Sequence, residues 1–189
     1  MKNIFTTIAA IAATSTALSL VMPQSVQAIT FNFSWQGDAG YSALGKFSYD
    51  ETTAPLIISE SGPGQTNDLQ SLSVSFFDPS NNLLGIYNTV TGGVSESLFF
   101  KFNFDTSNKT LFGNLDIAGG RLVEGEYFLQ GKIGSSLVFR QLIDPVSDTK
   151  ISLDQNYGAI TVSQVSEPAS VLSLLAFGAL GATLKRKKS

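Results

Sequence analysis

The residue types that carry most enzyme chemistry are missing from this 189-residue chain, which contains neither His nor Cys. It therefore has no imidazole general base, no thiolate nucleophile and none of the usual zinc ligands. What remains is carboxylate chemistry of the glycoside hydrolase kind, in which two acids face each other about 5 to 10 Å apart across a cleft. The acids expected near strand ends are Asp38, Asp50, Glu51, Asp116, Glu124 and Glu126.

Turn capping explains most of these acids better than catalysis, because short polar side chains accept backbone hydrogen bonds where strands end. We therefore predict no enzymatic activity, no catalytic residue and no cofactor. Loops at 78–82, 105–108 and 144–154 hold the oxygens that calcium prefers. None of them has the regular ligand spacing of a calcium-binding loop, so no metal site is predicted.

Aromatic side chains offer a second kind of chemistry, since an aromatic ring beside amide and carboxylate groups can bind a sugar. Trp35 alternates with Phe31 and Phe33, which favours a place in the core. Tyr41 and Tyr87 adjoin predicted loops, and we assign them as the candidate ligand contacts. The other available aromatic platforms are Tyr127 and Tyr157.

The elements that position these side chains are predicted to be strands. Apolar and polar residues alternate in three segments, 31–36, 71–76 and 100–104, which indicates strands with one buried and one wet face. Further strands are expected at 43–49, 56–59, 83–87, 110–117, 126–132, 136–143 and 158–163. We predict an all-β fold, a single antiparallel β-sandwich with jelly-roll-like topology.

Two polar segments interrupt this series of nine or ten strands, at 61–68 and at 88–97. The first contains Gly62-Pro63-Gly64 and the second contains Gly92-Gly93, and both sequences are typical of turns. Loops carried on a rigid sheet are common places for binding, so both segments are candidate binding loops.

Charge limits the partners of the predicted domain, residues 29–163. Between residues 29 and 165 there are seven Lys and Arg residues against fourteen Asp and Glu residues. A surface with this excess of negative charge repels a phosphate backbone, so we predict no nucleic acid partner. A length near 137 residues suits one hydrophobic core and is too short for two ordinary domains.

The N-terminal segment, residues 1–28, has the features of a signal peptide. Lys2 supplies a positive charge, residues 8–21 are mostly apolar, and 26–28 fit the small-x-small cleavage pattern. We predict that signal peptidase cleaves between Ala28 and Ile29.

The C-terminal segment, residues 164–189, combines three features. Ser166, Glu167 and Pro168 precede an apolar stretch at 169–184, and the chain then continues with the basic residues Lys185, Arg186, Lys187 and Lys188. The sixteen apolar or small residues would rise about 24 Å as a helix, whereas the hydrocarbon core of a membrane is about 30 Å thick. The basic cluster favours the cytoplasmic side, so the β domain would lie outside the inner membrane.

These three features in this order resemble the PEP-CTERM sorting signal of bacterial exported proteins. The resemblance rests on the Glu167-Pro168 pair, the apolar stretch with Gly178 and Gly181, and the terminal cations. The chain differs from the family at Ser166, where Pro is most common. The resemblance implies that an exosortase-like membrane enzyme processes the tail. The C-terminal helix would hold the chain in the inner membrane until then, and the protein would afterwards reach the cell surface or extracellular matrix.

The sequence thus predicts a non-enzymatic surface or extracellular-matrix protein that is exported and processed through its tail. Two alternatives remain open. One is a carbohydrate-binding or adhesion module that binds extracellular polysaccharide through residues such as Tyr41 and Tyr87. The other is a permanently membrane-anchored ectodomain whose tail is never removed.

Overall fold

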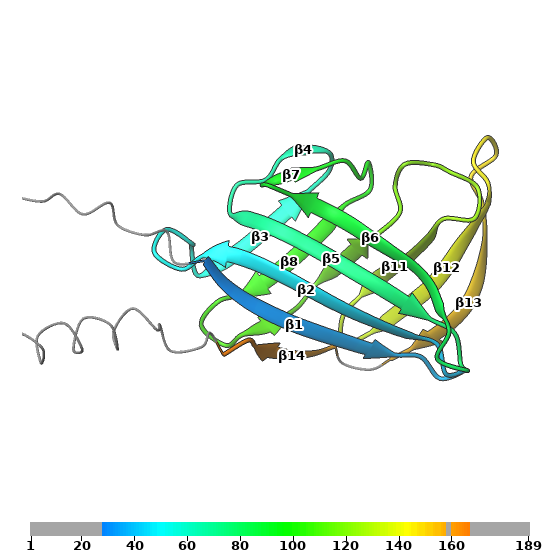
Figure 1. Ribbon diagram of the computed structural model, residues 1–189, viewed down its shortest axis with the longest axis horizontal. Helices are drawn as coiled ribbons and strands as arrows, with labels where there is room; N and C mark the ends of the chain where they lie inside the picture. The colour runs from blue at the N-terminus through cyan, green and yellow to red at the C-terminus, as the bar shows by residue number, and fades with distance from the viewer. Residues whose placement is uncertain (1–27, 158–159, 167–189) are drawn as a thin grey trace, which may run out of the picture.

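The computed structural model describes residues 28–157 and 160–166, and this part of the chain is all-β (Figure 1). Residues 1–27, 158–159 and 167–189 are outside it. The predicted signal peptide up to Gln27, the motif residues Glu167 and Pro168, the apolar stretch and the basic cluster therefore lie outside the described residues.

The strands form two antiparallel sheets, which we call sheet A and sheet B. Sheet A has the order β14-β1-β2-β5-β6-β7-β4, and sheet B has the order β13-β12-β11-β10-β8-β3, with β9 paired to β8. In sheet A the strands are β1 (Ala28–Gln36), β2 (Ser42–Asp50), β4 (Gly64–Gln65), β5 (Leu69–Phe77), β6 (Leu83–Thr91), β7 (Val94–Ser95) and β14 (Thr161–Gln164). In sheet B they are β3 (Ile57–Ser61), β8 (Lys101–Asp105), β9 (Thr110–Leu111), β10 (Asn114–Ile117), β11 (Tyr127–Lys132), β12 (Ser136–Asp144) and β13 (Thr149–Asn156).

The inner faces of the two sheets meet in one aromatic core. Phe47 of sheet A lies 5.0 Å from Phe102 and 4.9 Å from Phe104 of sheet B, measured between ring centroids. Phe76 of sheet A lies 4.7 Å from Phe139 of sheet B. These rings come from the alternating positions of their strands, which confirms that period-two alternation marked the buried face.

Three segments differ from the prediction. Segment 88–97 is no open loop, because β6 continues to Thr91 and turns through Gly92 and Gly93 into β7. Segment 110–117 forms two short strands, β9 and β10, rather than one. Between them the Phe112 N–H donates to the Asn103 carbonyl, and β10 then pairs with β11. Segment 61–68 contains the short strand β4.

Strand β13 was not predicted, because its sequence lacks the expected alternation. Its fully buried residue is Asp154 rather than an apolar one, and Ile151 is 43% exposed. The pairing of β12 with β13 also shifts register twice, between Phe139 and Arg140 and between Leu142 and Asp144. Such shifts break the period-two pattern on which strand prediction depends.

The described chain begins and ends at the same end of sheet A (Figure 1). β1 and β14 are antiparallel neighbours, with Phe31 opposite Gln164, and the Val165 N–H donates to the Thr30 carbonyl over 2.8 Å. β14 therefore extends one residue beyond the predicted domain limit at 163. The opposite edge of sheet A, with β6 and β7, carries the groove described next.

Candidate functional site

A groove of about 430 Å³ lies between sheet A and the connection from β10 to β11. β6 contributes residues 86–89, the chain after β7 contributes Glu96 and Ser97, and the connection contributes residues between 118 and 126. This volume falls within the usual range of about 300 to 1,000 Å³ for small-molecule sites. We refer to this feature as the groove.

One wall of the groove is a backbone segment in an unusual conformation, the 118–122 loop. Ala118 and Leu122 have positive φ angles of 66° and 57°, which side-chain-bearing residues rarely adopt. Gly119 and Gly120 are also left-handed, at 53° and 88°. Strain of this kind persists only where surrounding contacts hold the backbone in place, and it is common at binding sites.

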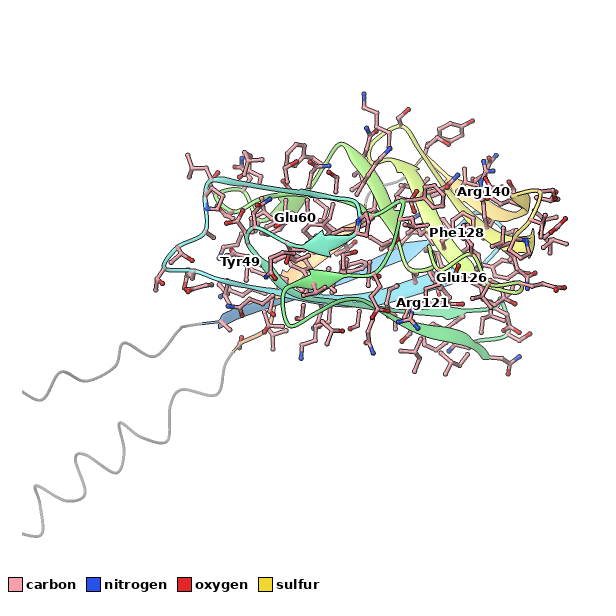
Figure 2. The ribbon with its side chains drawn as sticks, turned by 90° about the horizontal axis from the view of Figure 1, so that it is seen from above. Tyr49, Glu60, Arg121, Glu126, Phe128 and Arg140 are labelled. Atoms are coloured by element: carbon pink, nitrogen blue, oxygen red, sulfur yellow. The ribbon has the colours of Figure 1, made fainter. Side chains whose placement is uncertain are left out.

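Four hydrogen bonds to its backbone hold the loop in this conformation, one of them from the Leu98 N–H to the Gly120 carbonyl. Thr89 of β6 accepts the Ala118 N–H on its hydroxyl oxygen over 3.0 Å. The carboxylate of Glu126 accepts the N–H groups of Gly120 and Arg121 over 3.0 and 3.3 Å. Figure 2 shows Glu126 and Arg121 close together on the right-hand half of the molecule.

Gly120 allows the loop to approach Ser97 more closely than any other residue would. A Cβ atom at position 120 would lie 2.2 Å from the Ser97 Oγ and 2.9 Å from its Cα. Real Cβ atoms do not come this close to other heavy atoms. The contact therefore requires glycine both for space and for its φ angle of 88°.

Two buried residues with hydroxyl groups line the groove, Thr89 of β6 and Ser97 after β7. Ser97 is 3% exposed, and its Oγ has no hydrogen-bond partner among the residues that the structure describes. Buried hydroxyls are normally paired, so Ser97 is an exception, and the backbone of Gly120 lies against its Oγ. Thr89, 5% exposed, accepts the Ala118 N–H, and no described residue accepts its own proton.

Tyr87 contributes a third hydroxyl, and the residue is half-buried. Its ring packs against Phe76 at 5.8 Å, and its oxygen accepts the Tyr127 N–H over 2.9 Å. Burial raises the pKa of Tyr87, so its hydroxyl stays protonated at neutral pH. Of the two predicted ligand contacts, Tyr87 thus lies in the groove, but as a hydrogen-bonding group rather than a stacking platform.

Negative charge predominates in the groove. Glu96, Glu124 and Glu126 line it together with a single cation, Arg121. Arg121 already pairs with Glu96, and both side chains are exposed to solvent. The groove therefore carries an excess of two negative charges and has no unpaired cation for an anionic ligand.

The other predicted contact, Tyr41, is absent from the groove. Its ring packs against Phe139 at 5.5 Å, and its backbone N–H donates to Asp154 over 3.0 Å. Trp35 lies in the core as predicted, 2% exposed, with its indole N–H donating to the Asn156 side chain over 2.8 Å.

The six acids singled out in the sequence do not form one site. Glu124 and Glu126 meet in the groove, and Glu126 also caps the 118–122 loop. Asp50 caps its own turn by accepting the Thr52 hydroxyl and N–H, which lowers the pKa of Asp50. Asp116 lies on the outer face of sheet B, where burial raises its pKa to about 7 against the opposing effect of Lys101 and Lys150. Asp38 and Glu51 are exposed.

The oxygen-rich loops considered for calcium use their carboxylates locally. Asp78 accepts the N–H groups of Ser80 and Asn82, and Asp105 accepts those of Ser107 and Asn108. Together with hydrogen bonds from the Asn82 side chain to Asp78 and from the Ser107 hydroxyl to Asp105, which are the larger causes, these bonds lower the pKa of both carboxyls, that of Asp105 to about 2. Within 28–157 and 160–166, no cluster of three or more Asp and Glu side chains is arranged to hold a metal ion.

The predicted processing sites lie at the limits of the described chain. Ala28 is the first residue of β1, and Ile29, the predicted new N-terminus, is 5% exposed and part of the core. Ser166, the first residue of the predicted sorting motif, is exposed and follows directly after Val165. None of the described segments is a helix that could cross a membrane.

Comparisons with known proteins add no assignment. No family model matches the chain, no curated protein matches it, and no solved structure matches it. Of the groove residues, sequence reasoning had singled out Tyr87, Glu124 and Glu126. Ser97 fell within the candidate binding loop 88–97, but its burial was not predicted, because a serine in a polar segment carries no signal of burial.

Proposed function

We propose that this chain is a non-enzymatic, exported surface or extracellular-matrix protein whose tail is processed by an exosortase-like enzyme. The proposal includes removal of residues 1–28 by signal peptidase and transient anchoring in the inner membrane through residues 169–184. The exported part is proposed to be a β-sandwich with jelly-roll-like topology, for which the two antiparallel sheets and shared core are the support.

The observation that carries the proposal is the match between the limits of the fold and the predicted processing sites. The first strand starts at Ala28, and the last backbone hydrogen bond of the described chain joins Val165 to Thr30. The sorting motif begins at the next residue, Ser166. Removal of both terminal segments would therefore take only Ala28, the first residue of β1, from the strands of the described domain.

Mass spectrometry of the mature protein from its producing cells tests the proposal. We expect an N-terminus at Ile29 and a C-terminus near Glu167 or Pro168. Peptides that still contain Lys185 to Lys188 would instead support the permanently anchored ectodomain. A chain that keeps residues 1–28 would contradict export by cleavage.

We also propose carbohydrate binding or adhesion as a second function, because the groove has the features of a site for a small polar ligand. Thr89 and Tyr87 supply hydroxyls, and Glu124 supplies a carboxylate that accepts no hydrogen bond among the residues described. Sugars are bound largely through such hydrogen bonds, while exposed apolar groups such as Ile86 contact their C–H faces.

Retention on immobilised glycans tests this second function. We expect the protein to be retained and the variant Glu124→Gln to be retained less, because the variant lacks the exposed carboxylate of the groove. Absence of retention across neutral, basic and acidic glycans would rule out carbohydrate binding and leave the structural role.

A further inference from the structure

We propose that the outer face of sheet B is a docking surface for an acidic polysaccharide, a polymer whose sugar residues carry carboxylates. Four of the seven cations between residues 29 and 165 lie on this sheet, and we call them the basic face: Lys101, Lys132, Arg140 and Lys150. This inference goes beyond the groove proposed above, which has no unpaired cation for such a ligand.

Strand pairing places the first two of these cations on the outer side of the sheet. Lys101 of β8 and Gln130 of β11 lie opposite Asp116 from its two sides, and Lys132 is two positions after Gln130. Residues that are paired across strands, or two positions apart along one strand, share a face of the sheet. Phe102, next to Lys101, is fully buried in the core, so the shared face is the outer one.

The other two cations continue the same face. Arg140 of β12 lies opposite Phe128 of β11, and Figure 2 shows these two residues close together. Lys150 of β13 lies opposite Leu142, and its Nζ is 5.7 Å from the centroid of the Phe128 ring. At about 4.8 Å per strand, the basic face extends about 19 Å from β8 to β13.

Three of the four cations have no counter-ion in the described part of the chain. Lys101, Lys132 and Arg140 form no ion pair with a described residue, whereas Lys150 pairs with Asp148 over 2.6 Å. Arg140 is half-buried, and its Nε is covered without a hydrogen-bond partner. Its terminal nitrogens also have no described partner, but they are accessible. A carboxylate bound to these terminal nitrogens would form a charge-assisted hydrogen bond, one of the strong kinds in proteins.

The acids near the basic face compensate it only in part. Burial raises the pKa of Asp116 to about 7 against the opposing effect of Lys101 and Lys150, so this acid is partly protonated at neutral pH. Asp105 and Asp144 lie at strand ends and accept hydrogen bonds within their own turns. The face therefore keeps an excess of positive charge, although the domain as a whole is acidic.

Neutral polar side chains among the cations suit the hydroxyls of a sugar. Gln130, Ser136 and Ser152 share the outer face, and no described residue forms a hydrogen bond with their side chains. Amides and hydroxyls both donate to and accept from sugar hydroxyls. A polyuronate carries one charge per sugar residue, whereas duplex DNA carries one per about 1.7 Å and is repelled more strongly by the acidic domain. These features favour an acidic polysaccharide over a nucleic acid.

The test measures binding of a galacturonic acid hexamer to the full-length protein by calorimetry in low salt. Its fully methyl-esterified form has the same length without the charges and serves as the control ligand. We expect the acid hexamer to bind about tenfold more tightly, the effect of two exposed ion pairs. Added salt should reduce this preference, because exposed charges are screened. Equal binding of the two hexamers would overturn the proposal.

Matched variants locate the contact on the basic face. Lys132→Gln and Arg140→Gln should each weaken binding of the acid hexamer about threefold. Lys46→Gln removes an exposed cation from sheet A and should leave the affinity unchanged. All three variants keep the basic residues 185–188, so these do not affect the comparison. Equal losses in Lys46→Gln and Lys132→Gln would show general attraction between charges and overturn the proposal. Lys132 is exposed, so this variant remains informative where the loss of the half-buried Arg140 affects folding.

Further outcomes separate this face from other partners and from the groove. A DNA duplex that bound as tightly as the acid hexamer would show a surface for polyanions in general and overturn the choice of a polysaccharide. Failure of the acid hexamer to bind the folded protein, checked by circular dichroism, would overturn the proposal. Retention on neutral glycans would in that case still support the groove.

Discussion

Three buried carboxylates organise the loops of the domain, and each does so by accepting backbone N–H groups. Glu60 of β3 accepts those of Asp68 and Leu69 over 2.7 and 3.2 Å. Asp154 of β13 accepts those of Ala39 and Tyr41 over 2.8 and 3.0 Å. Glu126 holds the 118–122 loop in the same way, and Figure 2 shows it well separated from Glu60. Because β3 and β13 belong to sheet B, Glu60 and Asp154 link it to the loops of sheet A.

Replacing Glu60 by Gln should reduce the free energy of unfolding by about 2 to 4 kcal/mol, because hydrogen bonds to a charged group are strong and the amide places a donor against N–H groups. Urea denaturation measures this loss. The exposed Glu51→Gln variant serves as the control and should stay within about 0.5 kcal/mol of the parent. Equal stability of the two variants would show that the Glu60 contacts contribute little.

Asp116 should make the protein less stable as the pH rises. Burial raises its folded-state pKa from 3.8 to about 7, so the native state holds more protons than the unfolded chain between these values. Its contribution to stability is therefore favourable at low pH and decreases as the pH rises from about 4 to 7. Asp116→Asn should raise the melting temperature at pH 8 relative to the parent, and this gain should shrink at pH 5. A gain that is independent of pH would contradict the titration of Asp116.

At the scale of elements, the 118–122 loop is the part of the domain that depends most on close packing. Its left-handed backbone is held by Thr89 from β6 and by Glu126 before β11, so both sheets contribute to it. The groove is the space between this loop and β6, and the hydrogen bond from the Ala118 N–H to Thr89 fixes their distance. A change in the loop should therefore affect stability and ligand binding together.

Gly120→Ala tests this dependence against a matched control. Gly120 and Gly134 both have positive φ angles, 88° and 75°, but only a Cβ at 120 would meet another residue. Left-handed backbone costs about 1 to 2 kcal/mol for alanine at either position, and the clash with Ser97 adds to this at 120. By urea denaturation, Gly120→Ala should lose more stability than Gly134→Ala. Equal losses would mean that the loop moves away from Ser97 without penalty.

At the scale of the whole molecule, the aromatic core holds the two sheets together. The chain contains no Cys, so no disulfide contributes. Phe31 and Phe47 of sheet A stack at 5.3 Å, and both contact Phe104 of sheet B. Rings in such arrangements contribute about 0.5 to 1.5 kcal/mol beyond their buried area.

Phe47→Ala should reduce the free energy of unfolding by about 3 to 5 kcal/mol, because the ring is fully buried and its loss leaves a cavity between the sheets. Phe112, which is 38% exposed, provides the control, and Phe112→Ala should cost much less. Chemical denaturation of both variants measures the difference. A similar cost at both positions would contradict a core centred on Phe47.

The sequence by itself determined the fold class and the buried face of most strands. Period-two alternation is local information, because every second residue of a strand faces the same side, and it placed Trp35, Phe76 and Phe102 in the core correctly. β13 escaped prediction because its buried residue is the acid Asp154, whose partners, Ala39 and Tyr41, are more than a hundred positions away.

Only the tertiary structure decided the site. The sequence named Tyr87 and Glu124 as separate candidates and could not bring them together, since the groove forms where β6 meets the connection between β10 and β11. The burial of Ser97 depends on Gly120, whose backbone lies against the Ser97 hydroxyl. Strand periodicity depends on residues that are neighbours along the chain. Whether a hydroxyl is paired or a charge is compensated depends on residues that only folding brings together.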